Sequence, residues 1–455
     1  MVETLFKFNG CDAEVVSELL CYRKGCPGRA TCVCALGEDV CKSIWRPGGL
    51  PDEGETLSMF EGVFGVCQLK AHYSGKYSTK LKFGDQLEVS SYASFFLLSE
   101  GVSRAVAGPS ISSIHKNSAG LPPTSATSPG SDGPWAPGPV PQISVVREKR
   151  VKSDILMPRG TSLFDAQSSY HLLLAIRDAL MGIMAFTEAG KMRCDVSAYN
   201  LLLISVTKHY GLGSWLKAPK AQASAGMWNR TAKGTSVRKD TDERFSPRMA
   251  RVTSLCRGPV CVVHDTELIV DEDRPEGEVR TDWTGLPTFV SAQLSTAHIS
   301  GVPAARTFIH DVESLLWLLV WVVAHHSQKE DSWQINETAQ EVIEELRQIG
   351  WDEIAAYKKR LLSTKYGLRG TVRKFDHNWS EQLAPVIGRL ASFLHTYIYP
   401  YLETPDDSYL EAVVGCHEML INYSRSFISD WLFRDLDSTL AKLKTQCPPI
   451  DESKL

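Results

Sequence analysis

Residues 311–326 constrain the fold of this 455-residue chain more than any other stretch. They are apolar on nearly every side of a helix, so a helix here has no face that prefers water and belongs in the middle of a core. The longest apolar run within it, residues 315–324, has about half the length that a membrane crossing requires. We therefore expect a large protein core built around this helix.

The composition is that of an ordinary globular chain, with 43% hydrophobic residues, 22% charged residues and a net charge of −4. This balance predicts neither nucleic acid nor a membrane as a partner. Residues 1–20 lack the basic start and the apolar core of a signal peptide, so we expect an intracellular protein, cytoplasmic or nuclear. Five of the twelve cysteines lie within residues 21–41 without a Cys-x-x-Cys pair or a nearby histidine, which favours reduced structural thiols over a zinc site.

The amino-terminal part predicts a small β-rich unit with one helix. Residues 30–36 and 40–45 are strand-like and flank turn residues, which indicates a hairpin. A helix is expected after Pro51 because proline and aspartate favour a helix start. On it Glu53, Leu57 and Phe60 share one face by i, i+4, i+7 spacing, whereas Glu55 points elsewhere, so Glu53 is the acid carried inward.

Two segments break the pattern of regular structure. Residues 107–142 hold eight prolines among Gly, Ser and Ala, which predicts a flexible linker. Residues 205–258 hold eleven Lys or Arg against three acids, a surplus of eight. That segment is either a solvated surface insertion or a docking site for an acidic partner. The expected parts are therefore 1–106 (β-rich lobe), 107–142 (linker), 143–445 (helical lobe containing the 205–258 insert) and 446–455 (tail).

A polar loop follows the amphipathic helix expected at residues 170–189. It sets the carboxylate of Asp195 and the carboxamide of Asn200 with four residues between them, directly before an apolar strand. Phosphoryl transfer from ATP needs a cation on the phosphates, an acid that fixes this cation, two oxygen ligands for magnesium and a carboxylate that orients the attacking hydroxyl. Side chains of these types occur in a suitable order: Lys42, Glu53, Asp195, Asn200, Asp265 and Asp311.

Five blocks resemble a protein kinase, and more closely the fungal-type protein kinase family. They are residues 40–45 (VCKSIW), 174–182 (LAIRDALMG), 194–200 (CDVSAYN), 289–294 (FVSAQL) and, most specifically, 310–321 (HDVESLLWLLVW). The resemblance runs over roughly residues 20–330 with the two low-order segments interposed. It implies an α+β, bilobal protein kinase-like fold with a small β-rich N-lobe and a large helical C-lobe.

The resemblance also implies a role for each residue of the set, with ATP and Mg²⁺ as cofactors. Lys42 would contact the α and β phosphates and pair with Glu53, and Asp195 would orient the acceptor hydroxyl. Asn200 and Asp265 would ligate magnesium. Asp311 would support the loop around Arg193 and Cys194. Taken singly, these residues have ordinary alternatives: an exposed strand lysine, an acid at a helix start, the end of a strand and a helix N-cap.

Departures from the kinase pattern leave two functions open. Arg193-Cys194 stands where His-Arg precedes the catalytic aspartate, Asp265-Thr266-Glu267 replaces Asp-Phe-Gly, and Ser291-Ala292-Gln293 replaces Ala-Pro-Glu. The glycine loop offers only Gly25 and Gly28. One hypothesis is an ATP-dependent kinase acting on protein Ser/Thr hydroxyls, because the groups that touch phosphate and metal are present. The other is a pseudokinase that serves as a nucleotide-binding or scaffold module, and a small-molecule kinase is a third, weaker option.

Overall fold

A computed structural model describes most of the elements predicted above. The residues that it describes are 5–6, 14–15, 18–23, 31–47, 52–75, 150–189, 191–192, 195–205, 255, 257–266, 269–271, 286–301, 308–327, 335–348, 350–363, 367–375, 377–398 and 433–451. The predicted linker 107–142, nearly all of the basic segment, the loop around Gly25, the Arg193-Cys194 pair and Glu267 lie outside these residues.

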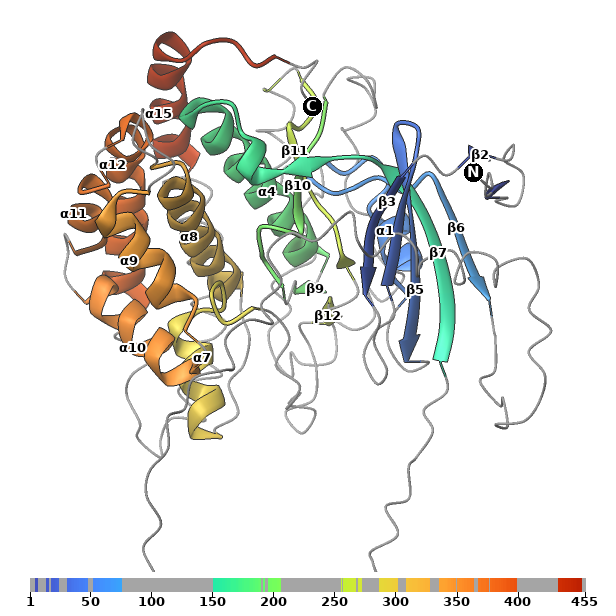
Figure 1. The fold of residues 1–455 in the computed structure, drawn as a ribbon, viewed down its shortest axis with the longest axis horizontal. Helices are drawn as coiled ribbons and strands as arrows, with labels where there is room; N and C mark the ends of the chain where they lie inside the picture. The colour runs from blue at the N-terminus through green and yellow to red at the C-terminus, as the bar shows by residue number, and fades with distance from the viewer. Residues whose placement is uncertain are drawn as a thin grey trace, which may run out of the picture.

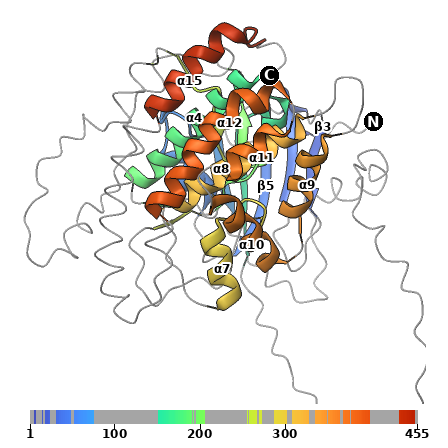
Figure 2. The ribbon, with the colours of Figure 1, turned by 90° about the vertical axis from the view of Figure 1, so that its left-hand side faces the viewer.

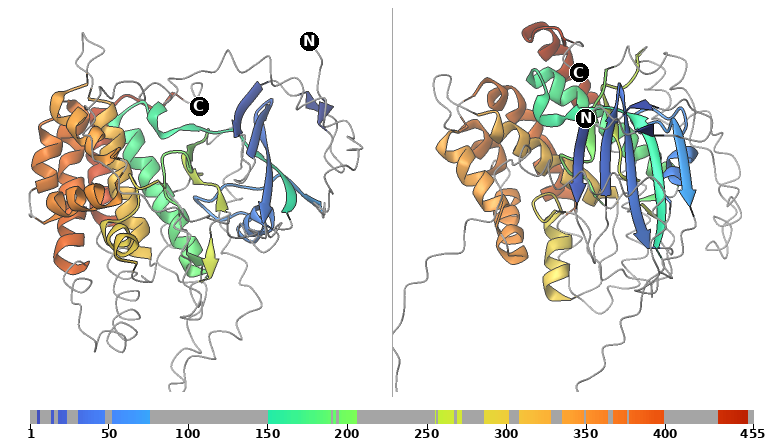
Figure 3. Two further views of the ribbon diagram at one scale, coloured as in Figure 1. Left: turned by 60° about the horizontal axis from the view of Figure 1, so that its bottom comes forward. Right: turned by 45° about the vertical axis from the view of Figure 1, so that its right-hand side comes forward.

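The fold is α+β, with a five-stranded antiparallel sheet and helix α1 (Glu53–Met59) on one side and the other described helices on the other side (Figures 1 and 3). The strands, in sheet order, are β3 (Glu18–Arg23), β4 (Thr31–Leu36), β5 (Asp39–Pro47), β7 (Arg150–Pro158) and β6 (Ala71–Gly75). The predicted hairpin is β4–β5, and its turn contains Gly37 at φ 60°, a backbone conformation that glycine adopts without strain. Cys34 and Cys41 lie opposite each other on the two strands of this hairpin, and both are buried free thiols.

Strand β7 corrects the predicted boundary between the two parts. Residues 143–445 were expected to form the helical lobe, but β7 lies inside the sheet between β5 and β6. Successive side chains of β7 point to opposite faces of the sheet, so Ile155 and Met157 lie in the main core and Asp154 lies on the opposite face. The reason is that chain order does not reveal strand order: β7 follows β6 only after residues 76–149, yet pairs with it directly.

Helix α1 (Glu53–Met59) packs against this sheet as its spacing predicts. Asp52 is its N-cap, Glu53 and Leu57 are buried, and Glu55 is exposed. Phe60, at the C-cap, is buried and meets the ring of Phe186 at 4.4 Å between centroids. This aromatic contact joins α1 to the long helix α4 (Ser169–Glu188).

Helix α8 (Phe308–His325) is the central helix of the core, as its apolar surface predicts. Every residue from Phe308 to Ala324 is buried, and α8 packs between α4, α9 and α12 (Figure 2). It begins three residues before Asp311, so Asp311 is not an N-cap. The other helical elements are η1 (Leu163–Asp165), α4 (Ser169–Glu188), α7 (Ala292–Ser300), α9 (Glu337–Leu346), α10 (Trp351–Leu362), α11 (Gly367–Arg373), α12 (Asn378–Phe393), the π-helical η6 (Leu394–Ile398) and α15 (Phe433–Gln446).

The sequence also predicts helices over residues 338–362, 379–401, 409–423 and 427–444, and the structure corrects the first of them. The expected single helix at 338–362 is two helices, because α9 ends at the C-cap Arg347 and Gly350 caps α10 in an extended conformation. The helix expected from 427 is described from Phe433, and the one expected at 409–423 lies outside the described residues. The expected tail is not separate, since Gln167 exchanges two hydrogen bonds of 2.7 Å with the backbone of Asp451.

Short strands connect the sheet region to the helices. β10 (Leu201–Leu203) pairs with β8 (Thr161–Ser162) and with β11 (Cys261–Val263), while β9 (Lys191–Met192) pairs with β12 (Val270–Asp271) and β1 (Leu5–Phe6) with β2 (Glu14–Val15). Val263 donates its N–H to the carbonyl of Gly65 at 2.8 Å, which ties the segment after α1 to β11. Gly65 has φ 81°, and a Cβ there would lie 2.4 Å from the carbonyl oxygen of Asp178 on α4, so only glycine allows this approach.

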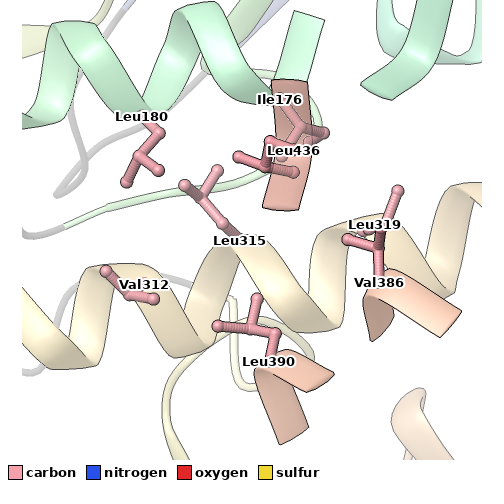
Figure 4. Close-up of a pocket in the computed structure, with 8 residues that line it drawn as sticks. All are labelled: Ile176, Leu180, Val312, Leu315, Leu319, Val386, Leu390 and Leu436. Carbon is pink, nitrogen blue, oxygen red and sulfur yellow. The ribbon is translucent and has the colours of Figure 1, made fainter. Parts of the chain in front are cut away.

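Helices α4 and α8 are long and apolar enough to cross a membrane by length and composition alone. In this fold 94% of the most apolar 18-residue stretch of each helix is buried within the protein, as in the core helices of globular domains. Where α4, α8, α12 and α15 meet, their side chains leave a small apolar cavity (Figure 4). It is lined by Ile176, Leu180, Val312, Leu315, Leu319, Val386, Leu390 and Leu436.

Candidate active site

Lys42 stands at the centre of a cluster of charged side chains between the sheet and β11. Strand β5 places it on the sheet face that carries α1, and only 7% of the residue is exposed. Its Nζ lies 2.7 Å from Glu53 Oε2 and 2.9 Å from Asp265 Oδ1. The structure thus brings together a lysine and two acids that are separated by up to 223 positions in the chain.

Glu53 links α1 to the segment after β11. While Oε2 accepts from Lys42, Oε1 accepts the backbone N–H of Thr266 at 3.2 Å. The hydroxyl of Thr266 donates in turn to the backbone carbonyl of Glu53 at 3.4 Å. Thr266 is fully buried, and it stands where the Asp-Phe-Gly pattern has phenylalanine. Hydrogen bonds therefore replace the packing of an aromatic ring at this position.

Asp265 has the one non-glycine backbone with positive φ among the described residues, at 61°. Aspartate tolerates this left-handed conformation better than most residues, and such conformations concentrate at functional sites. Asp265 lies two residues beyond the end of β11, and its side chain is 24% exposed. The turn therefore holds its carboxylate beside Lys42 while leaving it partly accessible to solvent.

Asp195 and Asn200 form one rigid turn. Asn200 Nδ2 donates to the backbone carbonyl of Asp195 at 3.0 Å and to its Oδ2 at 2.9 Å. The backbone of Asn200 also donates to Ser197 at 3.1 Å and accepts from His264 at 3.1 Å. Because Leu201 and Val263 pair in the β10–β11 ladder, Asn200 and Asp265 lie at the same end of that hairpin.

These side chains fit a magnesium–nucleotide group in their chemistry. Two carboxylates, those of Glu53 and Asp265, contact the one ammonium of Lys42, so this cluster carries a net negative charge that a divalent cation would offset. Magnesium prefers oxygen ligands and is commonly held by one or two protein groups, with phosphates and water completing the shell. Asp265 supplies a carboxylate. In Asn200 the nitrogen is committed to Asp195, so the oxygen is the carboxamide atom suited to a cation.

Asp311 is buried in the first turn of α8, with 1% of the residue exposed. Its predicted partners, Arg193 and Cys194, lie outside the described residues, so its supporting role stays a prediction. A buried carboxylate on the central helix is nevertheless costly unless it is well satisfied, which argues for a specific role at this position.

Lys358 and Glu313 support the segment at residues 286–293, in which Ser291-Ala292-Gln293 replaces Ala-Pro-Glu. Lys358, on α10, is fully buried and donates to the carbonyls of Pro287 at 3.0 Å and Val290 at 2.5 Å. Glu313, on α8, accepts the N–H of Ala292 at 2.9 Å. Burial lowers the pKa of Lys358, while Glu313 opposes this shift. Neither residue was predicted, because nothing in the sequence marks a lysine on an amphipathic helix as buried.

Asp178 is a further buried charge, and the sequence patterns did not single it out. It accepts from Arg257 through both carboxylate oxygens at 2.9 Å and from the backbone of Val260 at 2.9 Å. This arrangement fastens the start of β11 to α4, upstream of Asp265. A signal did exist: Asp178 and Arg177 are charged residues in the middle of an otherwise apolar helix.

The profile of the family described as "Fungal protein kinase" matches residues 11–323 of the chain. The matched stretch is more than two thirds of the sequence and contains Lys42, Glu53, Asp195, Asn200, Asp265 and Asp311. No curated protein matches the chain.

Proposed function

This chain belongs to the fungal protein kinase family, and we propose that it transfers the γ-phosphate of ATP to a Ser or Thr hydroxyl of a protein acceptor. The observation that carries the proposal is Lys42, which is ion-paired with Glu53 and with Asp265 at once. A lysine fixed by one acid and adjacent to a metal-ligating acid is what an ATP phosphate site requires.

Each residue has a task in this proposal. The sheet and the helices act as two lobes with the nucleotide between them, and Lys42 neutralises the α and β phosphates. Asn200 and Asp265 would hold magnesium, which offsets the phosphate charge that develops during transfer. Asp195 orients the acceptor hydroxyl, and its hydrogen bond from Asn200 keeps its carboxylate in place. Positioning and charge compensation account for most of the rate in reactions of this type.

A second candidate is a pseudokinase that binds nucleotide or a partner without turnover. Its support is the altered sequence at Arg193, Cys194 and Glu267. Two other departures argue less strongly for it than the sequence suggested. Thr266 forms hydrogen bonds with Glu53 in place of an aromatic contact, and Lys358 and Glu313 hold the segment in which Ser291-Ala292-Gln293 replaces Ala-Pro-Glu.

Transfer of labelled phosphate separates the two candidates. Purified protein is incubated with γ-labelled ATP, magnesium and generic protein acceptors, beside Asp195→Asn. We expect incorporation on Ser and Thr, reduced by about 10²-fold or more in the variant, since a positioned base contributes about that much. Incorporation no higher than in Asp195→Asn would contradict the enzyme proposal. A thermal shift with ATP, with and without magnesium, would then distinguish a nucleotide-binding module from a scaffold.

The basic segment 205–258 is proposed to dock an acidic partner away from the phosphate site. Its surplus of eight positive charges supports docking. The pairing of Leu203 with Cys261 means that the segment leaves and re-enters the fold at the hairpin end opposite Asn200 and Asp265. Replacing residues 208–252 by a short Gly-Ser linker should therefore leave transfer to generic acceptors unchanged and abolish retention on an anionic resin. Loss of the transfer itself would contradict this separation.

A further inference from the structure

Helix α1 is fastened to the sheet by a group of four residues, Asp52, Gly54, His72 and Ser153, which we call the α1 anchor. Asp52 is buried and is the N-cap of α1, accepting the backbone N–H of Gly54 at 2.8 Å. Its other oxygen accepts the hydroxyl of Ser153, on β7, at 2.7 Å. The Nε2 of His72, on β6, lies 2.8 Å from Asp52 Oδ1. One carboxylate thus joins the start of α1 to two strands.

The sheet register connects this anchor to Lys42. Lys42 pairs with Ile155 and Ile155 pairs with His72, so these three side chains form a row on one face of β5, β7 and β6. At one end of the row Lys42 binds Glu53, and at the other end His72 meets Asp52. Two consecutive residues at the start of α1 are therefore held by the two ends of a single cross-strand row.

Gly54 shows how closely the row and the helix approach. A Cβ built on Gly54 would lie 2.1 Å from Cδ2 of His72 and 2.3 Å from Cγ, so the imidazole ring lies directly on the first turn of α1. Any larger residue at this position would displace either the ring or the helix. The absence of a side chain at Gly54 lets α1 lie with Asp52 and Glu53 against the sheet.

We propose that Asp52 and His72 are positioning residues that keep Glu53 at Lys42 without a separate activating event. Glu53 reaches Lys42 only while α1 holds its present place on the sheet, and Asp52 is the residue immediately before it. The kinetic consequence rests on the proposed kinase function, whereas the structural consequence does not. Loosening the α1 anchor should weaken the Lys42–Glu53 pair before it unfolds the protein.

The first test reads Lys42 directly in the full-length protein, whether or not it transfers phosphate. Wild type, His72→Leu and His72→Gln are treated with an acetylating reagent well below the melting temperature, and acetylation is followed by mass spectrometry. Lys70, whose side chain is 38% exposed, serves as the internal reference. We expect Lys42 in His72→Leu to react about fivefold faster relative to Lys70, the change that about 1 kcal/mol of lost contact produces. His72→Gln, which retains a side-chain nitrogen able to approach Asp52, should recover most of the protection.

Tyr73→Leu is the matched control. Tyr73 is the next residue of β6, pairs with Asp154 on the opposite face, and is exposed. Its replacement should leave the reactivity of Lys42 unchanged. Equal reactivity of Lys42 in the wild type and in His72→Leu would overturn the proposal, as would the same increase in Tyr73→Leu.

The second test is kinetic. In His72→Leu we expect the KM for ATP to rise about fivefold, which corresponds to the same loss of about 1 kcal/mol, while the KM for the acceptor stays constant. In a Glu53→Gln background His72→Leu should add nothing, because both changes act through the same pair. Additive effects would overturn the proposal. If the wild type transfers no phosphate, the proposed function fails, and the acetylation of Lys42 still decides the role of His72.

Discussion

Lys42 donates to Glu53 and to Asp265 at the same time, its Nζ lying 2.7 Å from one carboxylate and 2.9 Å from the other. One acid belongs to α1 and the other follows β11, so the ammonium joins the sheet, the helix and the strand end that carries the proposed metal ligand. Glu53 reinforces this junction by accepting the N–H of Thr266. The junction is therefore both the proposed phosphate site and a structural joint.

Glu53→Gln should destabilise the protein, whereas Glu55→Gln should not. The first change removes the buried charge that faces Lys42, and a hydrogen bond to a charged group contributes about 2 kcal/mol. Glu55 is exposed on the same helix, so its replacement should change the free energy of unfolding by less than about 0.5 kcal/mol. Urea unfolding of both variants measures the difference. Equal effects would mean that Glu53 is not the inward acid.

Gly54→Ala should be destabilising although alanine favours helices. The added methyl group would meet the ring of His72, and overpacking of this kind costs about 1–3 kcal/mol. Gly370, in α11, is the matched control because a Cβ there meets nothing within 4 Å. Gly370→Ala should stabilise the protein by about 0.5–1 kcal/mol. Melting temperatures that shift in the same direction for both variants would contradict the close contact at His72.

His171 should make the protein less stable as the pH falls below neutral. It is buried, and its Nδ1 accepts the N–H of Gln167 at 3.3 Å, a bond that protonation removes. Burial lowers the pKa of His171 to about 4, against a smaller opposing effect of Asp178. The unfolded chain therefore takes up this proton first, near its usual pKa of 6.5, and stability is lost as the pH falls from about 6.5 to about 4.

The size of this effect can be measured by difference. Between pH 7 and pH 5, His171 should account for a loss of about 2 kcal/mol in the free energy of unfolding. His171→Asn keeps an acceptor for Gln167 and cannot be protonated, so its stability should depend less on pH by that amount. Burial also lowers the pKa of His325 and His326, and their contribution cancels when the two proteins are compared. Parallel pH curves would show that His171 is protonated in the folded state.

The apolar cavity between α4, α8, α12 and α15 should accept an additional methyl group (Figure 4). Val386 lines it, so Val386→Ile should raise the free energy of unfolding by about 0.8 kcal/mol, the gain from burying one methylene group. Val372, fully buried in α11, does not line the cavity, and Val372→Ile should be neutral or destabilising. A loss of stability in Val386→Ile would show that the cavity is too small for one carbon atom.

Local patterns predicted the elements that carry the site. The spacing of Glu53, Leu57 and Glu55 gave the correct buried and exposed faces of α1, because side chains one helical turn apart share a face. The apolar run at 315–324 predicted the central helix, since a helix without a polar side can only be buried. The β4–β5 hairpin followed from strand-like residues on either side of a turn.

Contacts between distant segments could not be predicted in the same way. β7 reads as a strand in the sequence, but its place between β5 and β6 depends on pairing across a long interruption of the chain. The contact of Asp52 with His72 joins residues on different elements and has no local signature. Lys358 is buried only because α10 packs over the carbonyls of residues 287 and 290, which the periodicity of α10 does not specify.

Magnesium-dependent binding of ATP tests the central claim most directly, because it requires no knowledge of the acceptor. ATP is titrated calorimetrically with and without magnesium into the wild type, Asp265→Asn and Asp39→Asn. Asp39→Asn is the control, because Asp39 is also a buried acid paired with a lysine, Lys70. We predict that magnesium tightens binding to the wild type and to Asp39→Asn by about tenfold or more, equivalent to about 1.4 kcal/mol, and that Asp265→Asn loses most of this gain. The same magnesium dependence in Asp265→Asn as in the wild type would contradict the account.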